Sequence, residues 1–265
     1  MSDLKEITAR FNVYDFLNPI ISGTYFIFGT LIILYPVNLF SINDIILSIL
    51  FKGGKNQGII YAIFVVLFYL MIAYILGLIL QFLGQSFFNF KENQMIEGSL
   101  KCLERHSFRI QYPFNSYFKL RAFRADARYI FEMKNLGRFD HNNPEHNNYV
   151  YAFCVYHNQI YGFNQKTETL REVWGLSKEL TTASFILFII ALCVALASFL
   201  IQLDNYLADL LIGVFFIAIT FVFYYRTQLA LRNRIRMNYS LYHVSKDIYS
   251  MSLKIDNLHK LSTQK

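Results

Sequence analysis

The sequence predicts an all-α membrane protein with four transmembrane helices and a helical cytoplasmic extension. Four windows contain no Asp, Glu, Lys or Arg; they hold 28, 35, 24 and 16 residues, at 16–43, 56–90, 180–203 and 210–225. A helix needs about 20 apolar residues to cross a bilayer. Composition agrees, because charged residues make up 16% of the chain, below the roughly 25% of soluble domains.

The distribution of basic residues predicts the orientation. Of the 25 Lys and Arg residues, 23 lie in the N-terminal segment, in 85–180 and after Tyr225, whereas Lys52 and Lys55 are the two in the hairpin loops. Basic residues near helix ends stay on the cytoplasmic side. Both termini and the middle region are therefore expected to face the cytoplasm, and the net charge of +7 follows from topology.

The segment 1–84 is expected to form an amphipathic N-terminal helix followed by the first transmembrane hairpin. Leu4, Ile7 and Phe11 share one helical face and indicate a short helix on the inner surface. The first membrane helix is expected to start at Pro19, since proline is tolerated in a first turn. An apolar run in the outer loop, 42–51, indicates a short interfacial helix.

Small residues on the predicted spans indicate close helix packing. The second span is expected at 58–84, and the second hairpin, 181–226, contains spans at 181–202 and 206–225. Two glycines lie seven residues apart on the second span, and two alanines have small-xxx-small spacing on the third. The predicted packing residues are Gly77, Gly84, Ala191 and Ala195.

The cytoplasmic region, 85–180, reads as helical. One helix is expected over 114–137, ending at Gly137. Without a strong breaker after Glu145, a long helix is expected to continue into the third span. The basic C-terminal tail, 227–265, also reads as helical and extends the fourth span inward.

Motifs of catalysis and cofactor binding are missing from the sequence. It contains no GxxxxGK, GxGxxG, GxSxG or HExxH pattern, so we expect no enzyme, no cofactor and no metal site. His141, His146, His157 and Glu145 match no familiar zinc spacing, and their Asn-rich surroundings indicate a solvated turn. A membrane-embedded lipid enzyme stays open as a further reading, although no acid–base set converges in sequence.

The charge-free windows also bear on transport. Proton relays and pumps carry ionisable groups within the membrane, so we expect neither a pump nor a secondary transporter. Gln81 and Gln202 are the most polar side chains near the spans, and interhelical hydrogen bonding explains them. An oligomeric pore with an apolar constriction remains compatible with this composition.

An arginine stripe is the candidate ligand site. Arg121, Arg124 and Arg128 have i, i+3, i+7 spacing on the predicted cytoplasmic helix, and Tyr117 precedes them by one turn. Guanidinium groups arranged in this way can hold phosphates of a lipid, a nucleotide or RNA. Attraction to anionic lipid, with salt bridges to neighbouring acids, is the alternative.

The layout resembles a diffuse group of uncharacterised bacterial four-span proteins. The resemblance lies in the segment 11–23 (FNVYDFLNPIISG), the end of the second span at 77–84 (GLILQFLG), the long helix before the third span and the basic stretch 232–242. Pro19 and Gly23 are separated here, whereas the group more often has adjacent Pro-Gly. Members often accompany phage-defence genes, as small membrane proteins paired with RNA-guided nucleases or second-messenger pathways.

The resemblance implies a non-enzymatic effector or accessory of antiviral defence in the bacterial inner membrane. Such a protein would oligomerise through its spans and perturb or gate the membrane in response to a cytoplasmic signal. Its expected partners are the lipid bilayer, further copies of the chain, and a cytoplasmic protein or a phosphate-bearing ligand such as a nucleotide or RNA. The alternative is a non-conducting structural subunit of a larger membrane complex.

Overall fold

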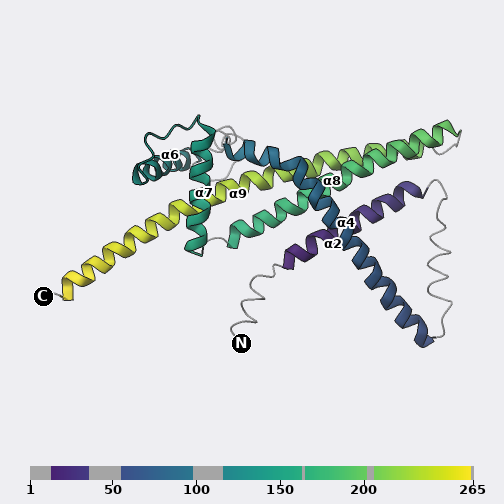
Figure 1. The fold of residues 1–265 in the computed structure, drawn as a ribbon, viewed down its shortest axis with the longest axis horizontal. Coiled ribbons are helices and arrows are strands. Elements are labelled where there is room, and N and C mark those ends of the chain that lie inside the picture. Colours follow the sequence, from purple (N-terminus) through teal and green to yellow (C-terminus); the bar gives the residue numbers. More distant parts are fainter. Residues whose placement is uncertain (1–12, 36–54, 98–115, 163–164, 202–205, 264–265) are drawn as a thin grey trace. The chain divides into compact units, whose positions relative to one another are not determined.

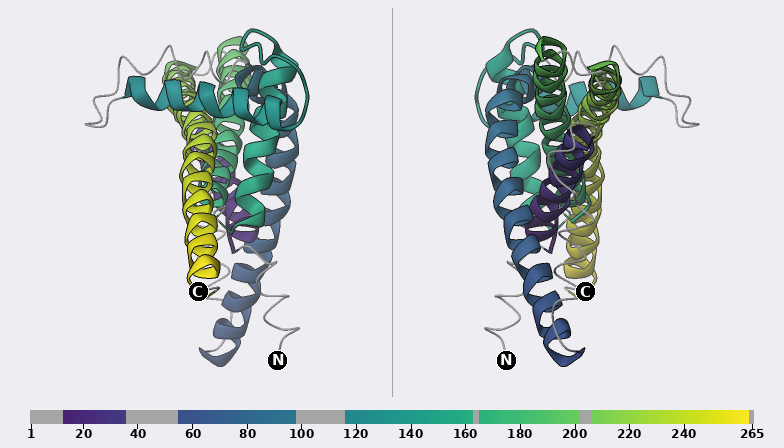
Figure 2. Two further views of the ribbon diagram at one scale, coloured as in Figure 1. Left: turned by 90° about the vertical axis from the view of Figure 1, so that its left-hand side faces the viewer. Right: turned by 90° about the vertical axis from the view of Figure 1, so that its right-hand side faces the viewer.

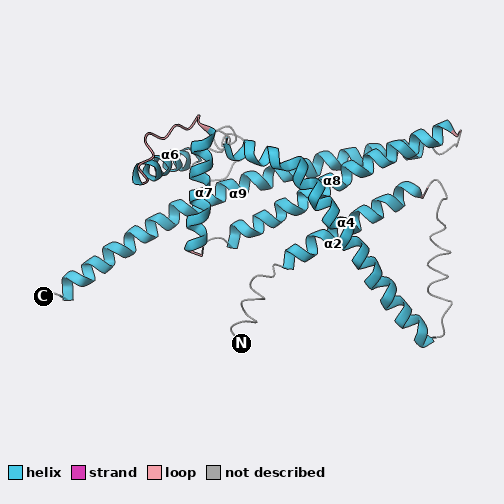
Figure 3. Ribbon diagram, viewed as in Figure 1, coloured by secondary structure: helices cyan, strands magenta, loops and turns pink. Residues whose placement is uncertain are grey.

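The computed structural model describes residues 13–35, 55–97, 116–162, 165–201 and 206–263. Every regular element in these ranges is an α-helix (Figures 1 and 3). The helices are α2 (Val13–Leu34), α4 (Lys55–Glu97), α6 (Ser116–Met133), α7 (Pro144–Ile160), α8 (Gln165–Leu200) and α9 (Tyr206–Thr263). The predicted all-α class is confirmed. The predicted amphipathic helix with Leu4, Ile7 and Phe11 and the predicted interfacial helix at 42–51 lie outside the described residues.

Four of these helices are long and apolar enough to cross a membrane, namely α2, α4, α8 and α9. Most of their apolar side chains face outward, as shown by Phe64 and Phe82, which are 68% and 69% exposed. In water such exposure is unfavourable, whereas lipid tails solvate it. The chain is therefore a helical membrane protein.

The chain divides into two compact units. The membrane unit comprises Met1–Phe88 and Glu172–Thr227, and the polar unit comprises Asn89–Arg171 and Gln228–Lys265. Helices α4, α8 and α9 each contribute residues to both units without a break in the helix; their lengths are clear in the views of Figures 1 and 2.

Close packing of α2 against α4 depends on glycine. A Cβ at Gly23 would overlap the backbone of Ala73, and a Cβ at Gly77 would overlap the carbonyl of Pro19. The two backbones therefore touch where no side chain separates them, which is how small residues let membrane helices approach.

A small apolar core joins α2 to the hairpin of α8 and α9. Ile33, Leu187, Ala191 and Phe216 form its buried centre. These side chains come from three helices and interlock as in the interior of a soluble domain. This core holds α2, α8 and α9 together within the membrane unit.

Several predicted helix boundaries were wrong. Pro19 lies inside α2, which begins six residues earlier at Val13. A proline removes one helical hydrogen bond, and here the position is held by contact with Gly77. The second span does not stop at 84, since α4 continues to Glu97.

The long helix predicted from Glu145 is two helices. α7 ends at Ile160, Gly162 has φ +72°, and α8 begins at Gln165. A positive φ is left-handed backbone that glycine adopts without strain, so the chain turns there. The predicted helical continuation of the chain beyond the fourth span is confirmed, because α9 runs to Thr263.

Candidate anion-binding site

Helix α6 is held against α9 within the polar unit by a buried carboxylate. The side chain of Asp126 is 7% exposed; its Oδ2 lies 2.7 Å from Nδ1 of His243, and its Oδ1 accepts a 2.8 Å hydrogen bond from Nζ of Lys246. The ring of Phe123 packs on Tyr239 with 5.6 Å between centroids. One face of α6 is thereby fixed, and its other face is left to solvent.

The C-terminus of α6 is closed by a Schellman motif. The N–H of Leu136 donates to the carbonyl of Phe131, and the N–H of Asn135 donates to the carbonyl of Glu132. Asn135 has φ +55°, the left-handed conformation that this motif requires at C′. The prediction that Gly137 ends the helix was wrong, because the asparagine does so two residues earlier.

Gly137 instead redirects the loop that follows. Its φ is +81° and an added Cβ would meet nothing within 4 Å, so the backbone conformation alone requires glycine. The chain then brings Phe139 back onto α6, where its ring packs against Phe131 with centroids 5.2 Å apart. The two residues after Gly137 therefore lie beside the last turn of α6.

The next helix, α7, begins with standard capping. Asn143 accepts a 3.0 Å hydrogen bond from the N–H of Glu145, and Pro144 occupies the first turn. Asp140 accepts a 2.9 Å hydrogen bond from the N–H of Asn142, and this backbone hydrogen bond lowers the pKa of its carboxyl group. The loop between α6 and α7 is therefore held by hydrogen bonds where it enters α7.

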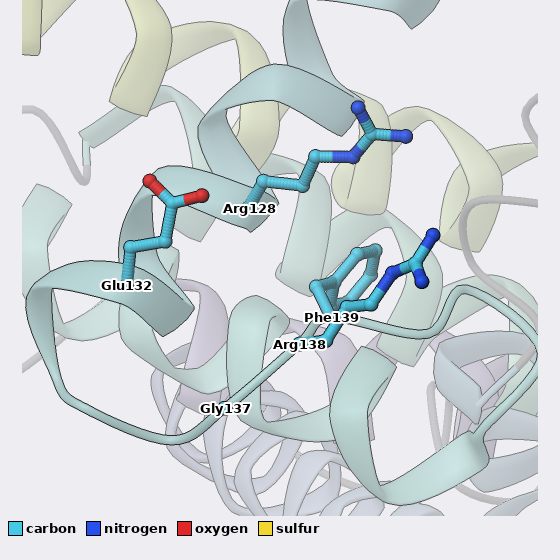
Figure 4. A pocket seen from close by; sticks show the side chains of 5 residues that line it. All are labelled: Arg128, Glu132, Gly137, Arg138 and Phe139. Atoms are coloured by element: carbon cyan, nitrogen blue, oxygen red, sulfur yellow. The ribbon is translucent and has the colours of Figure 1, made fainter.

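These elements enclose a cavity of about 260 Å³ on the surface of the polar unit, the arginine pocket. Its lining residues are Arg128, Glu132, Gly137, Arg138 and Phe139. Figure 4 shows both guanidinium groups toward one side of the pocket and the carboxylate of Glu132 toward the other, with the ring of Phe139 beside Arg138.

The charged groups of the arginine pocket are available to a ligand. Arg128 and Glu132 stand one helical turn apart, a spacing that often gives an ion pair, but Figure 4 shows the guanidinium group of Arg128 turned away from Glu132. Among the described residues, no ion pair or hydrogen bond engages the side chains of Arg128, Glu132 or Arg138. Two guanidinium groups side by side favour a phosphate or carboxylate.

The structure separates the members of the predicted arginine stripe. Arg128 lines the pocket. Arg124 is partly buried and already takes part in another interaction, while the side chains of Tyr117 and Arg121 lie outside the described part. Arg138 was missed by sequence reasoning, which compared residues on one helix only; its position after a glycine in a short loop was the available signal.

The predicted packing residues all make contacts within the chain. Gly77 lies against Pro19, a Cβ at Gly84 would stand 3.1 Å from Oγ1 of Thr182, Ala191 belongs to the apolar core, and Ala195 is 7% exposed. Each therefore contributes to the fold of a single copy.

Buried polar groups in the membrane unit were also missed. Ser22 donates a 3.0 Å hydrogen bond to Oε2 of Glu179, and Ser198 donates a 2.8 Å hydrogen bond to Oδ2 of Asp209. Both carboxylates are at most 1% exposed. Glu179 and Asp209 each directly precede a charge-free window in the sequence. A search for windows without charged residues therefore excludes them from the predicted spans.

The histidines of the polar unit make contacts of their own. Nδ1 of His146 accepts a hydrogen bond from the N–H of Asp140, and Nδ1 of His157 lies 3.2 Å from Oγ of Ser245. Burial lowers the pKa of His157. Among the described residues, no three His, Cys, Asp or Glu side chains are grouped so as to hold a metal ion.

Comparisons with known proteins found no match, neither to a family model nor to a curated protein nor to a solved structure.

Proposed function

We propose that the chain is a non-enzymatic integral membrane effector that is controlled by a phosphate-bearing ligand in the arginine pocket. The observation that carries this proposal is the position of Arg128 on α6, the helix that Asp126 ties to α9. Helix α9 begins at Tyr206 as the last membrane span and continues through the polar unit. One helix therefore links the ligand site to the membrane.

The chemistry of the pocket supports an anionic ligand. Arg128 and Arg138 present two planar guanidinium groups, each able to donate two parallel hydrogen bonds to phosphate oxygens. A ligand that draws these groups together would act on α6 at a point two residues from Asp126. Movement of Asp126 would then displace its two partners on α9, His243 and Lys246, which lie one turn apart.

The setting of this activity comes from the sequence resemblance. It supports a bacterial inner membrane, a cytoplasmic polar unit, assembly of several copies through the spans and a role in antiviral defence. In that setting infection changes the occupancy of the arginine pocket, and the response of the spans perturbs the membrane.

The test is membrane potential and dye entry in bacterial cells that express the full chain, with and without phage challenge. The variants are the double substitution Arg128→Gln/Arg138→Gln and the control Lys134→Gln, which removes an exposed cation of the same loop outside the pocket. We expect depolarisation only under challenge, in wild type and control but not in the double variant, at equal amounts in the membrane fraction.

Two results would contradict the proposal in different ways. Depolarisation that survives in the double variant would show that the arginine pocket does not receive the signal. Absence of depolarisation in all strains would favour the alternative, a non-conducting accessory subunit, whose partner would be sought by co-purification.

A further inference from the structure

We infer that the arginine pocket takes a ligand with a phosphate at one end and a primary amine at the other, the chemistry of phosphoethanolamine. The inference rests on the proposed phosphate site and adds the role of Glu132. It follows from the separation of opposite charges across one small cavity.

The acidic side of the pocket is unfavourable for a simple anion. Glu132 lines the same cavity as the two arginines, and its charge repels a phosphate or carboxylate that enters. If its role were to neutralise Arg128, the i, i+4 spacing would let the two side chains pair, yet the guanidinium group of Arg128 points away from it. A ligand with a positive group at that end uses both sides of the pocket.

The position of Glu132 on α6 is fixed by the end of the helix. The carbonyl of Glu132 accepts the N–H of Asn135 within the Schellman motif, so this residue belongs to the last ordered turn of α6. Phe139, which also lines the pocket, packs against Phe131 and His146, with ring centroids 5.2 Å and 6.1 Å apart. The fold therefore sets the backbone positions of Glu132 and of the loop that carries Arg138, which line the same pocket.

The size of the cavity restricts the ligand. Its volume of about 260 Å³ falls just below the range of roughly 300 to 1,000 Å³ that is typical of pockets for drug-sized molecules. A phosphate joined to an amine by a two-carbon linker fits within it, whereas a dinucleotide would extend into solvent. The same chemistry occurs free in solution and as the headgroup of phosphatidylethanolamine.

The first experiment compares two ligands that differ only in the amine. The full-length protein, in a glycoside detergent without phosphate or charge, is titrated calorimetrically with O-phosphoethanolamine and with ethyl phosphate. We expect phosphoethanolamine to bind about threefold to fivefold more tightly, the size of effect that a partly exposed ion pair gives. Glu132→Gln should reduce this ratio to about one and strengthen binding of ethyl phosphate.

Two further variants make the comparison specific. Arg138→Gln should weaken both ligands by about tenfold, since it removes a charge-assisted hydrogen bond. Glu145→Gln, which removes an exposed acid outside the pocket, should leave the ratio unchanged. Equal binding of the two ligands to wild type would overturn the amine inference and leave the phosphate proposal standing; binding of neither ligand would overturn both.

The second experiment separates the two sources of the ligand. The chain is reconstituted in vesicles of phosphatidylglycerol, with or without phosphatidylethanolamine, and titrated with free phosphoethanolamine. If the lipid headgroup occupies the pocket, the lipid should suppress binding of the free ligand in wild type, and the suppression should disappear in Glu132→Gln. Unchanged binding assigns the pocket to a free ligand, and a lipid effect that Glu132→Gln does not alter contradicts the inference.

Discussion

The hydroxyl group of Ser22 on α2 donates a hydrogen bond to the carboxylate of Glu179 on α8, 3.0 Å away and fully inside the membrane unit. Asn18, one turn earlier on α2, donates from its side-chain amide to the carbonyl of Glu172 at 3.3 Å. Two successive polar residues of α2 thus bind α8 along one line. Groups of this kind are retained in membrane interiors where they specify which helices pair.

Replacing Ser22 with alanine should destabilise the membrane unit. The change leaves the buried carboxylate of Glu179 without its hydroxyl donor, and an unsatisfied buried acceptor costs about 1–3 kcal/mol. The measurement is unfolding of the purified protein in mixed micelles. Glu179→Gln should lower the free energy of unfolding by less in the Ser22→Ala background than in wild type. Additive effects of the two substitutions would show that the pair is not coupled.

The glycines of the α2–α4 crossing should respond to alanine in proportion to the space around them. Gly23→Ala and Gly77→Ala force two backbones apart, and overpacking of this kind costs about 1–3 kcal/mol. Gly213→Ala is the matched control, because its Cβ would lie at an ordinary 3.6 Å from Ala191. Thermal melting in detergent should show a lower midpoint for the first two only; equal effects at all three would contradict the crossing.

Removal of the Asp126 carboxylate should loosen α6 from α9. Asp126→Asn leaves Lys246 without its anionic partner and weakens the contact with His243. We expect a loss of about 2 kcal/mol in the free energy of unfolding, because the side chains of Lys246 and His243 are themselves about a third exposed. Hydrogen exchange in α6 is the readout. Lys246→Met should lower the free energy of unfolding by less in the Asp126→Asn background than in wild type. An equal decrease in both backgrounds would exclude the ion pair.

The polar unit should lose stability in mild acid through His157. Burial between Ser245, Tyr242 and Tyr161 lowers the pKa of this imidazole below its usual 6.5. The folded state therefore holds the neutral ring, and the stabilisation is complete above pH about 6.5 and is lost as pH falls through the folded pKa. His157→Gln should flatten the pH dependence of unfolding between pH 7 and 5; an unchanged slope would assign it to other groups.

The four spans were predictable because they follow from a one-dimensional property, the spacing between charged residues. Helix ends were less predictable. Asn135 and Gly162 both adopt positive φ. From sequence alone, glycine is the residue that most strongly predicts this conformation. The prediction therefore placed the end of the helix at Gly137, two residues after Asn135, where the left-handed turn begins. Asparagine tolerates the left-handed conformation without being restricted to it, so its presence near the end of a predicted helix does not by itself mark the last turn.

Of the two arginines in the candidate site, one could be predicted from the sequence. Helical periodicity brings together residues of one helix, so it found Arg128. Arg138 reaches the same cavity through the left-handed turn at Gly137, and no periodic rule connects a helix to the loop beyond it. Glu179 and Asp209 illustrate a different limit: hydropathy places a charged residue at the edge of a span and does not report whether a neighbouring helix covers it.

The contact between Gly77 and Pro19 also has a consequence for how this gene can vary. Every single-base change that converts a glycine codon into the codon of another amino acid places a Cβ atom on the Cα atom of that residue. At Gly77 and Gly23 that atom would coincide with main chain, which unlike a side chain has no alternative rotamer. In a library of random point variants selected for a folded membrane protein, these two codons should be among the least tolerant, while the lipid-facing phenylalanines of α4 exchange freely for other apolar residues.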